Sequence, residues 1–304
     1  MSESNEFVKC NDHLHVIYLC EYCNLNCTYC YEDGKSRKKI DFETAKNIVD
    51  EIMEMVDNEV TARIMLFGGE PLLNYEVFYA ITEYAYNEYF LKGRNIMFNT
   101  ITNGTLLNER KVKELFKFHD FLSIHVSIDG DQEAHDACRV FHNGRGSYDI
   151  VIKNVKFLLK YFPFAVIRLV ITDVDKFYNN VKFLRSIGVR TFTIQALKGD
   201  TPSTPYYIKR YYEVIKQLEE EFSHLNRVEI NEYSEPITDV EAYSTRKKEE
   251  ALKTDEEYRY FGTDGGKIFK PTYFEGEFQD FTKGTDASYN ANKKSREEAI
   301  GVKN

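Results

Sequence analysis

The sequence lacks the features of a membrane-spanning, exported or nucleic-acid-binding protein. No apolar run reaches the roughly 18 residues that a transmembrane helix needs. Residues 1–6 (MSESNE) are polar and acidic, unlike a signal peptide, so we expect an unexported chain. Its 40 lysines and arginines are outnumbered by 49 aspartates and glutamates, which gives a formal net charge of −9. This charge provides no electrostatic case for a nucleic acid or a membrane surface, and we expect neither as a partner.

Tryptophan is also absent, but this excludes nothing, because 42% of the 304 residues are hydrophobic and 14% are aromatic. That composition can build a sizeable core, and the length fits one α/β domain, with or without a small appendage. The six cysteines are unevenly spread, since four lie within residues 20–30 and none follows Cys138. Clustered thiols in an unexported chain are expected in the reducing cytoplasm, where they bind metal rather than pair.

The segment at residues 20–31, CEYCNLNCTYCY, carries four of the six cysteines, and we call it the cysteine loop. A zinc site usually takes two well-separated CxxC pairs, but here the two pairs are only three residues apart. A ferredoxin cluster takes another spacing with a proline after the last cysteine, where Tyr31 stands. The third candidate is a [4Fe–4S] cluster held by three thiolates. Its fourth iron would have no protein ligand and would be open to a small molecule.

Hydrophobic patterns predict strands that alternate with amphipathic helices along the first two thirds of the chain. The expected strands are residues 13–19, 62–67, 95–101, 121–128, 165–171 and 191–196. Expected helices fill the intervals, with Asp41 and Asn74 as N-caps and a last helix at 206–222. Regular alternation of this kind predicts an α/β fold with a parallel sheet. Six units fit an open, partial (β/α)6 barrel better than a closed eightfold one.

Unusual local sequences follow the ends of these strands. The cysteine loop follows the first strand, GGEP (68–71) the second, TNGT (102–105) the third, and SIDG (127–130) closes the fourth. Chemistry in parallel sheets lies at the carboxyl ends of the strands. We therefore expect these four segments to form one site.

The order and content of four segments resemble the radical S-adenosylmethionine (SAM) enzymes over about residues 13–200. These segments are CNLNCTYCY, FGGEPLL, TNGT, and SIDG followed by HD-x2-R. More narrowly, they resemble the branch with anaerobic sulfatase-maturating enzymes and peptide-modifying SPASM proteins. The resemblance implies that Cys23, Cys27 and Cys30 hold one [4Fe–4S] cluster. It also implies that SAM binds the open iron through its amino and carboxylate groups. Reductive cleavage of SAM would give a 5′-deoxyadenosyl radical that takes hydrogen from a substrate.

The resemblance implies contacts with the methionine part of SAM as well. Gly68 and Gly69 would let backbone approach it closely, because they lack Cβ. Glu70 would accept a charge-assisted hydrogen bond from the SAM ammonium. Ser127 and Arg139 would engage the SAM carboxylate, whose planar shape suits a guanidinium.

The nucleoside part of SAM has its own implied neighbours. Tyr29 and Leu197 would lie near the adenine, and Thr102 and Asn103 near the ribose. Each of the implied residues also has a plainer interpretation. Glu70 alone could be a surface carboxylate, Ser127 could face a helix, and Arg139 could pair with Asp136.

The resemblance also suggests how the chain divides. We expect an N-terminal segment at 1–12, a radical SAM partial-barrel domain at 13–225, a C-terminal region at 226–282 and a disordered tail at 283–304. Residues 260–271 resemble the hairpin of SPASM proteins without its thiolates. Because no cysteine follows Cys138, auxiliary clusters are excluded by ligand count and at most one cluster can form. Sulfatase maturation itself is therefore doubtful.

The function expected from all of this is hydrogen abstraction from a peptide that is being modified after translation, by an oxidoreductase or isomerase-like reaction. A flavodoxin or ferredoxin would supply the electron. One alternative keeps the chemistry but takes a small metabolite or nucleotide as substrate. Another is a non-catalytic zinc-binding or cluster-binding module. Cys20 and Cys138 are expected to be free thiols, and no catalytic acid or base is assigned.

Overall fold

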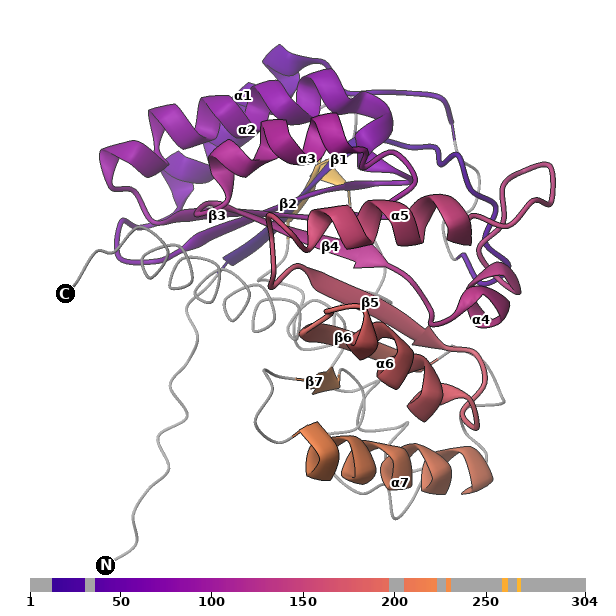
Figure 1. Cartoon of the computed structure of the whole chain (residues 1–304). Coiled ribbons are helices and arrows are strands. Elements are labelled where there is room, and N and C mark those ends of the chain that lie inside the picture. The colour runs from indigo at the N-terminus through magenta and orange to yellow at the C-terminus, as the bar shows by residue number, and fades with distance from the viewer. Residues whose placement is uncertain are drawn as a thin grey trace, which may run out of the picture.

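The computed structural model describes residues 13–30, 36–196, 205–222, 228–230, 259–261 and 267–268 (Figure 1). Its sheet has the strand order β7-β6-β5-β4-β3-β2-β1-β8-β9. The six expected strands are confirmed and lie parallel: β1 (His13–Cys20), β2 (Ala62–Gly68), β3 (Ile96–Thr102), β4 (Leu122–Ser127), β5 (Val166–Ile171) and β6 (Thr191–Ala196). The α/β class and the partial-barrel architecture predicted from the sequence are therefore correct.

Helices connect the strands and cover one face of the sheet (Figure 1). They are α1 (Phe42–Met55), α2 (Tyr75–Glu88), α3 (Glu109–Leu115), α4 (Gln132–Asp136), α5 (Tyr148–Leu158), α6 (Phe177–Ser186) and α7 (Pro205–Phe222). Short 3-10 turns stand at η1 (Pro71–Asn74), η2 (Phe90–Lys92) and η3 (Phe116–Phe118). In the described part of the chain, no helix is both long and apolar enough to cross a membrane.

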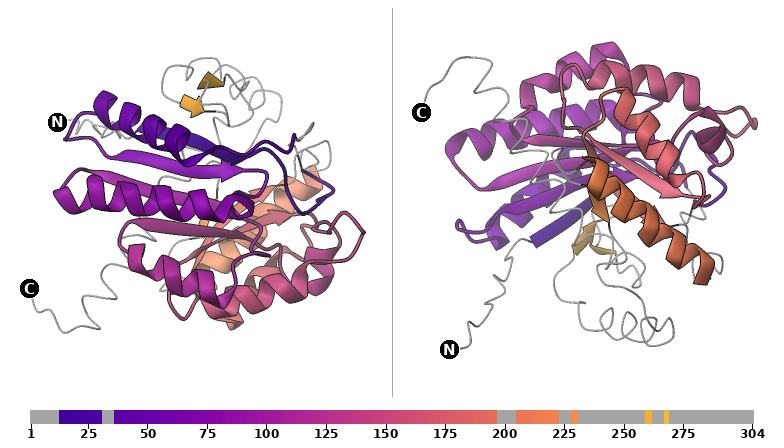
Figure 2. Two further views of the ribbon diagram at one scale, coloured as in Figure 1. Left: turned by 90° about the horizontal axis from the view of Figure 1, so that it is seen from above. Right: turned by 60° about the horizontal axis from the view of Figure 1, so that its bottom comes forward.

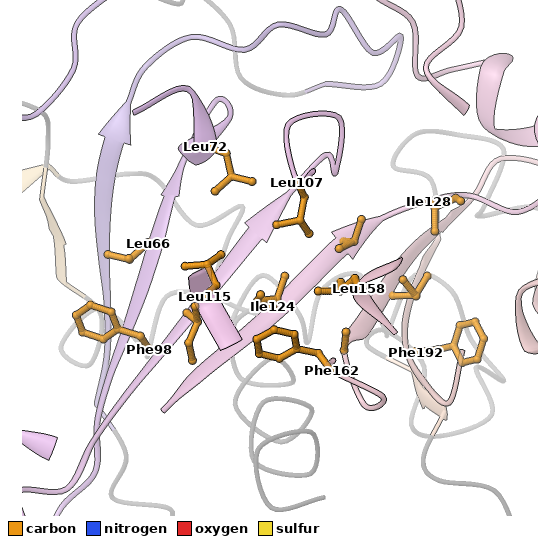
Figure 3. Close-up of a cluster of buried hydrophobic side chains, with 14 of the residues drawn as sticks. Leu66, Leu72, Phe98, Leu107, Leu115, Ile124, Ile128, Leu158, Phe162 and Phe192 are labelled. Atoms are coloured by element: carbon orange, nitrogen blue, oxygen red, sulfur yellow. The ribbon is translucent and has the colours of Figure 1, made fainter. Parts of the chain in front are cut away.

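The core lies between the sheet and its helices, because strand side chains alternate between two faces. On the helix-covered face, Leu66, Phe98 and Ile124 of the strands pack with Leu115 and Leu158 of the helices (Figure 3). Burying each such side chain contributes about 1.5–3 kcal/mol. The opposite face has a smaller apolar cluster on β1 and β2, made of Leu14, Val16, Tyr18, Met65 and Phe67. On strands β3 to β6 this opposite face is polar. Its buried side chains include Asn99, Ser123, His125, Arg168 and Gln195.

The two predicted N-caps have different outcomes. Asp41 caps α1 as expected, because its Oδ1 accepts from the Thr44 N–H at 2.8 Å. Asn74 stands at the N-cap position of α2 as predicted, but its side chain makes no capping bond to this helix. Its Nδ2 instead donates to the carbonyls of Leu19, at 3.0 Å, and Ile40, at 2.8 Å. Asn74 therefore joins the end of β1 to the segment that precedes α1, a role that local sequence does not reveal.

Three short strands extend the sheet beyond the six expected ones. β7 (Val228–Ile230) pairs in parallel with β6, and β8 (Arg259–Phe261) pairs in parallel with β1. β8 and β9 (Lys267–Ile268) pair antiparallel, as a hairpin requires (Figure 2). The sequence indicated this hairpin but not its place beside β1. The segments 1–12 and 283–304 lie outside the described residues, and the division of the chain into domains stays a prediction.

Candidate functional site

The cysteine loop leaves β1 at the carboxyl edge of the sheet, directly after Cys20. The Cys20 thiol is buried and donates to the Glu70 carbonyl at 2.9 Å. Burial raises the pKa of this thiol to about 11, so Cys20 stays protonated at neutral pH. Cys23 and Cys27 are half-buried and Cys30 is exposed. Cys20 is therefore more deeply buried than the other three cysteines of the loop, and the ligand set of Cys23, Cys27 and Cys30 stays a prediction.

Two nitrogen donors bind the sulfur of Cys23, which also lies 3.9 Å from the Asn24 Oδ1. The Leu25 N–H and the Asn103 Nδ2 each donate to the Cys23 Sγ at 3.4 Å. Donors of this kind favour a thiolate, and hydrogen bonds to sulfur are one means by which proteins tune iron–sulfur clusters. The environment of Cys23 therefore fits a cluster ligand. Among the described ranges, no three His, Cys, Asp or Glu side chains are grouped as a site for a single metal ion.

A segment far along the chain holds the cysteine loop in place. The Asn26 N–H donates to the Val140 carbonyl at 2.7 Å, and the Thr28 N–H donates to the Cys138 carbonyl at 3.0 Å. An isolated antiparallel bridge joins Leu25 to Phe141. Sequence reasoning missed this pairing, because residues more than a hundred positions apart share no local pattern.

Two glycines, one ending β2 and one following it, are required by the cysteine loop itself. Gly68 has φ +142°, and a Cβ on it would lie 2.2 Å from the Cys20 carbonyl oxygen. A Cβ on Gly69 would lie 2.3 Å from the Tyr22 carbonyl carbon and 2.8 Å from the Cys23 nitrogen. Backbone therefore occupies the space that a side chain would need. The predicted approach of SAM to these glycines stays a prediction beside this structural role.

Glu70 is fully buried, so its interpretation as a surface carboxylate is wrong. Its Oε1 accepts from the Leu72 N–H at 3.1 Å and from the Thr102 hydroxyl at 2.7 Å, and its Oε2 accepts from the Asn103 N–H at 2.7 Å. Burial raises the pKa of Glu70 to about 7, although these three hydrogen bonds oppose the shift. Glu70 thereby ties the end of β2 to the end of β3. Its predicted contact with the SAM ammonium stays a prediction.

Asn103 extends this arrangement to the cysteine loop. Besides its bond to the Cys23 sulfur, its Nδ2 donates to the Asn24 Oδ1 at 2.9 Å. Its Oδ1 accepts from the Thr105 hydroxyl at 2.6 Å, and the Asn24 Nδ2 donates to that hydroxyl at 2.8 Å. We call Glu70, Thr102, Asn103 and Cys23 the Glu70 network. It brings together predicted residues from three of the four motif segments.

Arg139 and Tyr29 belong to a second cluster, centred on Asp129. The Arg139 Nε donates to the Asp129 Oδ2 at 2.8 Å and its Nη2 donates to Oδ1 at 3.3 Å. The Tyr29 hydroxyl also donates to Oδ2, and the Arg139 guanidinium carbon lies 5.2 Å from the centroid of the Tyr29 ring. We call these three residues the Asp129 network. The alternative pairing of Arg139 with Asp136 is wrong, because Asp129 takes that place.

Burial and charge act in opposite directions within the Asp129 network. Burial opposes the charge of Arg139, but the neighbouring Asp129, Tyr29 and Cys27 raise the pKa of the guanidinium. Burial raises the pKa of Tyr29 well above its usual range, with Arg139 opposing and Asp129 adding to the shift. Arg139 is therefore a buried cation and Tyr29 a neutral phenol. A charge on Cys27 raises the pKa of both groups, so this cysteine lies close to the Asp129 network.

The two remaining predicted residues stand apart from these networks. Ser127 ends β4, is 8% exposed and lies in register with Arg168 of β5. It therefore shares the polar face of the sheet, and its predicted contact with the SAM carboxylate stays a prediction. Leu197 lies outside the described residues. Sequence reasoning missed Asp129, the residue on which the hydrogen bonds of Arg139 and Tyr29 converge. Its place in SIDG, directly after a strand and before a glycine, was the available signal.

Known proteins resemble this sequence over part of its length. The sequence model of the Radical SAM superfamily matches residues 17–176, which is more than half of the chain. An uncharacterised protein of Methanocaldococcus jannaschii is 37% identical over 179 residues, or 58% of this chain and 59% of that one. The cysteine-type anaerobic sulfatase-maturating enzyme of Clostridium novyi is 34% identical over 144 residues, or 46% of this chain and 38% of that one. The chain thus spans about three fifths or less of the length of these relatives.

Solved structures are similar in fold. The enzyme anSMEcpe with bound AdoMet matches with a TM-score of 0.62 at 22% identity, covering 72% of this chain and 61% of that one. Streptococcus suis SuiB bound to its precursor peptide SuiA matches with a TM-score of 0.63 at 16% identity, covering 87% of this chain and 60% of that one. At these identities the likeness concerns the fold.

Proposed function

Because the chain belongs to the radical SAM superfamily, whose cofactors are a [4Fe–4S] cluster and SAM, we propose that it abstracts hydrogen from a peptide substrate with a single cluster. When bound, the cluster and SAM supply the radical chemistry. Cys23, Cys27 and Cys30 would hold the cluster. The residues of the Glu70 and Asp129 networks would position SAM and keep the site closed to water.

The observation that carries this proposal is the convergence of the motif segments at one edge of the sheet. Through Asn103, the Glu70 carboxylate is linked to the Cys23 sulfur, although these residues come from the ends of three different strands. Buried polar groups that are this fully bonded are rigid, which is what the positioning of a reactive cofactor requires. A cluster held by thiolates needs cysteines that are kept reduced, so we extend a reducing compartment such as the cytoplasm to this chain as part of the proposal.

A peptide substrate is proposed from the relatives. Similar proteins include a cysteine-type anaerobic sulfatase-maturating enzyme, a radical SAM cyclopropyl synthase and SuiB bound to a precursor peptide. We extend the peptide class, and an electron donor such as a flavodoxin or ferredoxin, to this chain as part of the proposal. A small metabolite or nucleotide as substrate is the competing outcome of the substrate test.

The cofactor test is anaerobic reconstitution with iron and sulfide, followed by reduction with dithionite in the presence of SAM. We expect a brown protein with roughly four irons per chain that forms 5′-deoxyadenosine. Cys27→Ala should lose this activity. Cys138→Ala is the matched control, because Cys138 contacts the loop through its backbone carbonyl. A colourless protein with one zinc and no SAM cleavage would establish the non-catalytic alternative.

The substrate test follows once SAM cleavage is established. Short peptides encoded beside the gene are incubated with the reduced protein and SAM, and mass spectrometry records any change in peptide mass. A deuterated peptide that transfers deuterium into 5′-deoxyadenosine identifies itself as the hydrogen donor. Transfer from a metabolite or nucleotide pool, with none from the peptides, would replace the peptide by the small-molecule alternative.

A further inference from the structure

We propose that Asp129 is a positioning residue of the SAM site, which fixes Arg139 and Tyr29 against the cysteine loop. This inference rests on the proposed function, since it concerns how the chain holds that cofactor. It goes beyond the motif residues, because Asp129 orients two of them without needing to touch SAM itself. The argument starts from the number of hydrogen bonds that its carboxylate accepts.

Hydrogen-bond donors occupy every acceptor position of the Asp129 carboxylate. A carboxylate offers about four lone-pair sites. Asp129 fills them with the Nε and Nη2 of Arg139, the Tyr29 hydroxyl and the Val170 N–H, the last at 3.0 Å. The residue is 1% exposed. A carboxylate so buried and so fully bonded acts through its partners, and these come from the cysteine loop, the segment after α4 and strand β5.

Asp129, by contrast, engages only some of the N–H donors of Arg139. A guanidinium has five N–H donors, and Asp129 engages one on Nε and one on Nη2. One N–H of Nη1 and the second N–H of Nη2 form the other edge of the fork. This edge matches a carboxylate in shape. Within the described residues, Asp129 holds Arg139 by one edge and the second edge stays available to an anionic ligand, which is the part that the SAM carboxylate would take.

A second set of contacts fixes the backbones of Asp129 and Arg139. The Asp129 N–H donates to the His135 Nδ1 at 3.4 Å, and His135 Nε2 lies 2.9 Å from the Ser147 Oγ. The Ser147 hydroxyl donates to the Arg139 carbonyl at 2.8 Å. Position 129 is therefore joined to position 139 both through side chains and through this chain of polar groups. Such double support is expected where the orientation of a side chain matters.

Tyr29 carries the effect into the cysteine loop. It lies between Thr28 and Cys30 in sequence, and its hydroxyl is bonded to Asp129 while its ring lies beside the guanidinium. Because Asp129 holds this ring, it also restrains the segment that carries Cys27 and Cys30. Loss of the carboxylate should therefore change both SAM binding and the surroundings of the predicted cluster.

The test compares Asp129→Asn with wild type after anaerobic reconstitution. Asparagine keeps the size but puts an NH2 group against donors of Arg139 or Tyr29. We expect cluster content to stay near wild type, SAM to bind about 10- to 100-fold more weakly, as for other outer-shell partners, and the SAM-induced change in the cluster's EPR spectrum to shrink. Decarboxylated SAM is the second ligand. The preference for SAM over this analogue should fall in Asp129→Asn and in Arg139→Lys by similar factors.

Asp131→Asn is the matched control, because Asp131 lies two positions away and caps α4 by accepting from the Ala134 N–H at 3.0 Å. It should leave both affinities near wild type. An Asp129→Asn protein that binds SAM and discriminates against the analogue like wild type would overturn the inference, with the proposed function intact. A wild-type protein that neither loads a cluster nor cleaves SAM would overturn the proposed function first.

A second variant covers the case in which Asp129→Asn does not load a cluster. Tyr29→Phe removes one of the four donors to Asp129 and keeps the ring, so the protein should fold and load. We expect a smaller loss of SAM affinity, about threefold, together with an altered EPR spectrum of the SAM complex. A Tyr29→Phe protein identical to wild type in both measurements would then overturn the inference.

Discussion

The Glu70 network and the Asp129 network hold the same cysteine loop by different physical means. At the ends of β2 and β3, close backbone packing and hydrogen bonds to a buried carboxylate fix the half of the loop around Cys23. At the end of β4, a buried ion pair and an aromatic ring fix the half around Tyr29. The first arrangement tolerates almost no change in shape, whereas the second depends on charge. Substitutions that alter shape and substitutions that alter charge should therefore separate the two.

The largest expected effect is that of Gly69→Ala. The new Cβ would lie 2.3 Å from the Tyr22 carbonyl carbon, so the cysteine loop must move. We expect this variant to lose the cluster and at least about a hundredfold in SAM cleavage, because misplacement by about 1 Å costs this much elsewhere. Iron content and 5′-deoxyadenosine formation measure the two losses.

Gly93→Ala is the control for this substitution. Gly93 has φ +83° and nothing within 4 Å of its would-be Cβ, so alanine there brings backbone strain of about 1–2 kcal/mol without a clash. It should lower the melting temperature and leave the iron content unchanged. Equal iron loss in both variants would mean that the space beside Gly69 is not the cause.

The second prediction concerns the response of stability to pH at His135, beside the Asp129 network. Burial lowers the pKa of this histidine to about 4, from an ordinary value of 6.5. The unfolded chain therefore takes up the proton first as pH falls. The stability that neutral His135 provides is complete above pH 6.5 and is lost as pH falls to about 4, by roughly 3 kcal/mol at most. In urea unfolding of the cofactor-free chain, His135→Gln should reduce the loss between pH 7 and pH 5.

The stability that Glu70 contributes should change with pH in the opposite direction. Its pKa is raised to about 7 from 4.5, so the unfolded chain loses the proton first as pH rises. The stability from protonated Glu70 is complete below pH 4.5 and is lost as pH rises to about 7, again by roughly 3 kcal/mol at most. Glu70→Gln removes this pH dependence, whereas His135→Gln leaves it in place. Variants with the same pH profile would contradict the separation of the two networks.

Glu70→Gln has a further effect that does not depend on pH. Its carboxylate accepts from Thr102 on one oxygen and from Asn103 on the other, whereas an amide offers only one acceptor oxygen. One buried donor is left without its acceptor, which destabilises the fold by about 1–3 kcal/mol. The free energy of unfolding at pH 7 measures this loss against the gain from removing the buried charge. A variant at least as stable as wild type would mean that the buried charge costs more than the missing acceptor.

The two networks also differ in how far the sequence predicts them. The strands, the cysteine loop and the GGE, TNG and SIDG segments follow from hydrophobic alternation and from motif order, and the sheet then brings their ends to one edge. Asp129 escaped prediction, because an aspartate before a glycine at a strand end is typical of an ordinary turn. The pairing of residues 138–141 with the loop, the bonds of Asn74 and the place of β8 beside β1 escaped it too. All three depend on contacts between distant segments, which leave no periodic signal.

The smallest expected effect tests whether the two networks act separately. Helix α5 follows directly on Ser147, which braces Arg139, and carries Asn154, whose Nδ2 donates to the Gly104 carbonyl at 2.8 Å. Asn154→Ala removes bonds to the backbone carbonyls of Gly104 and Thr105 only, so we expect about 1 kcal/mol less stability and a SAM affinity within about twofold of wild type. Asn154→Asp should destabilise more, because it buries a carboxylate against carbonyl oxygens and neither group can donate a hydrogen bond to the other. If Asn154→Ala instead weakened SAM binding as strongly as Asp129→Asn, α5 would couple the networks, and the loop would be held by one cooperative structure rather than by two.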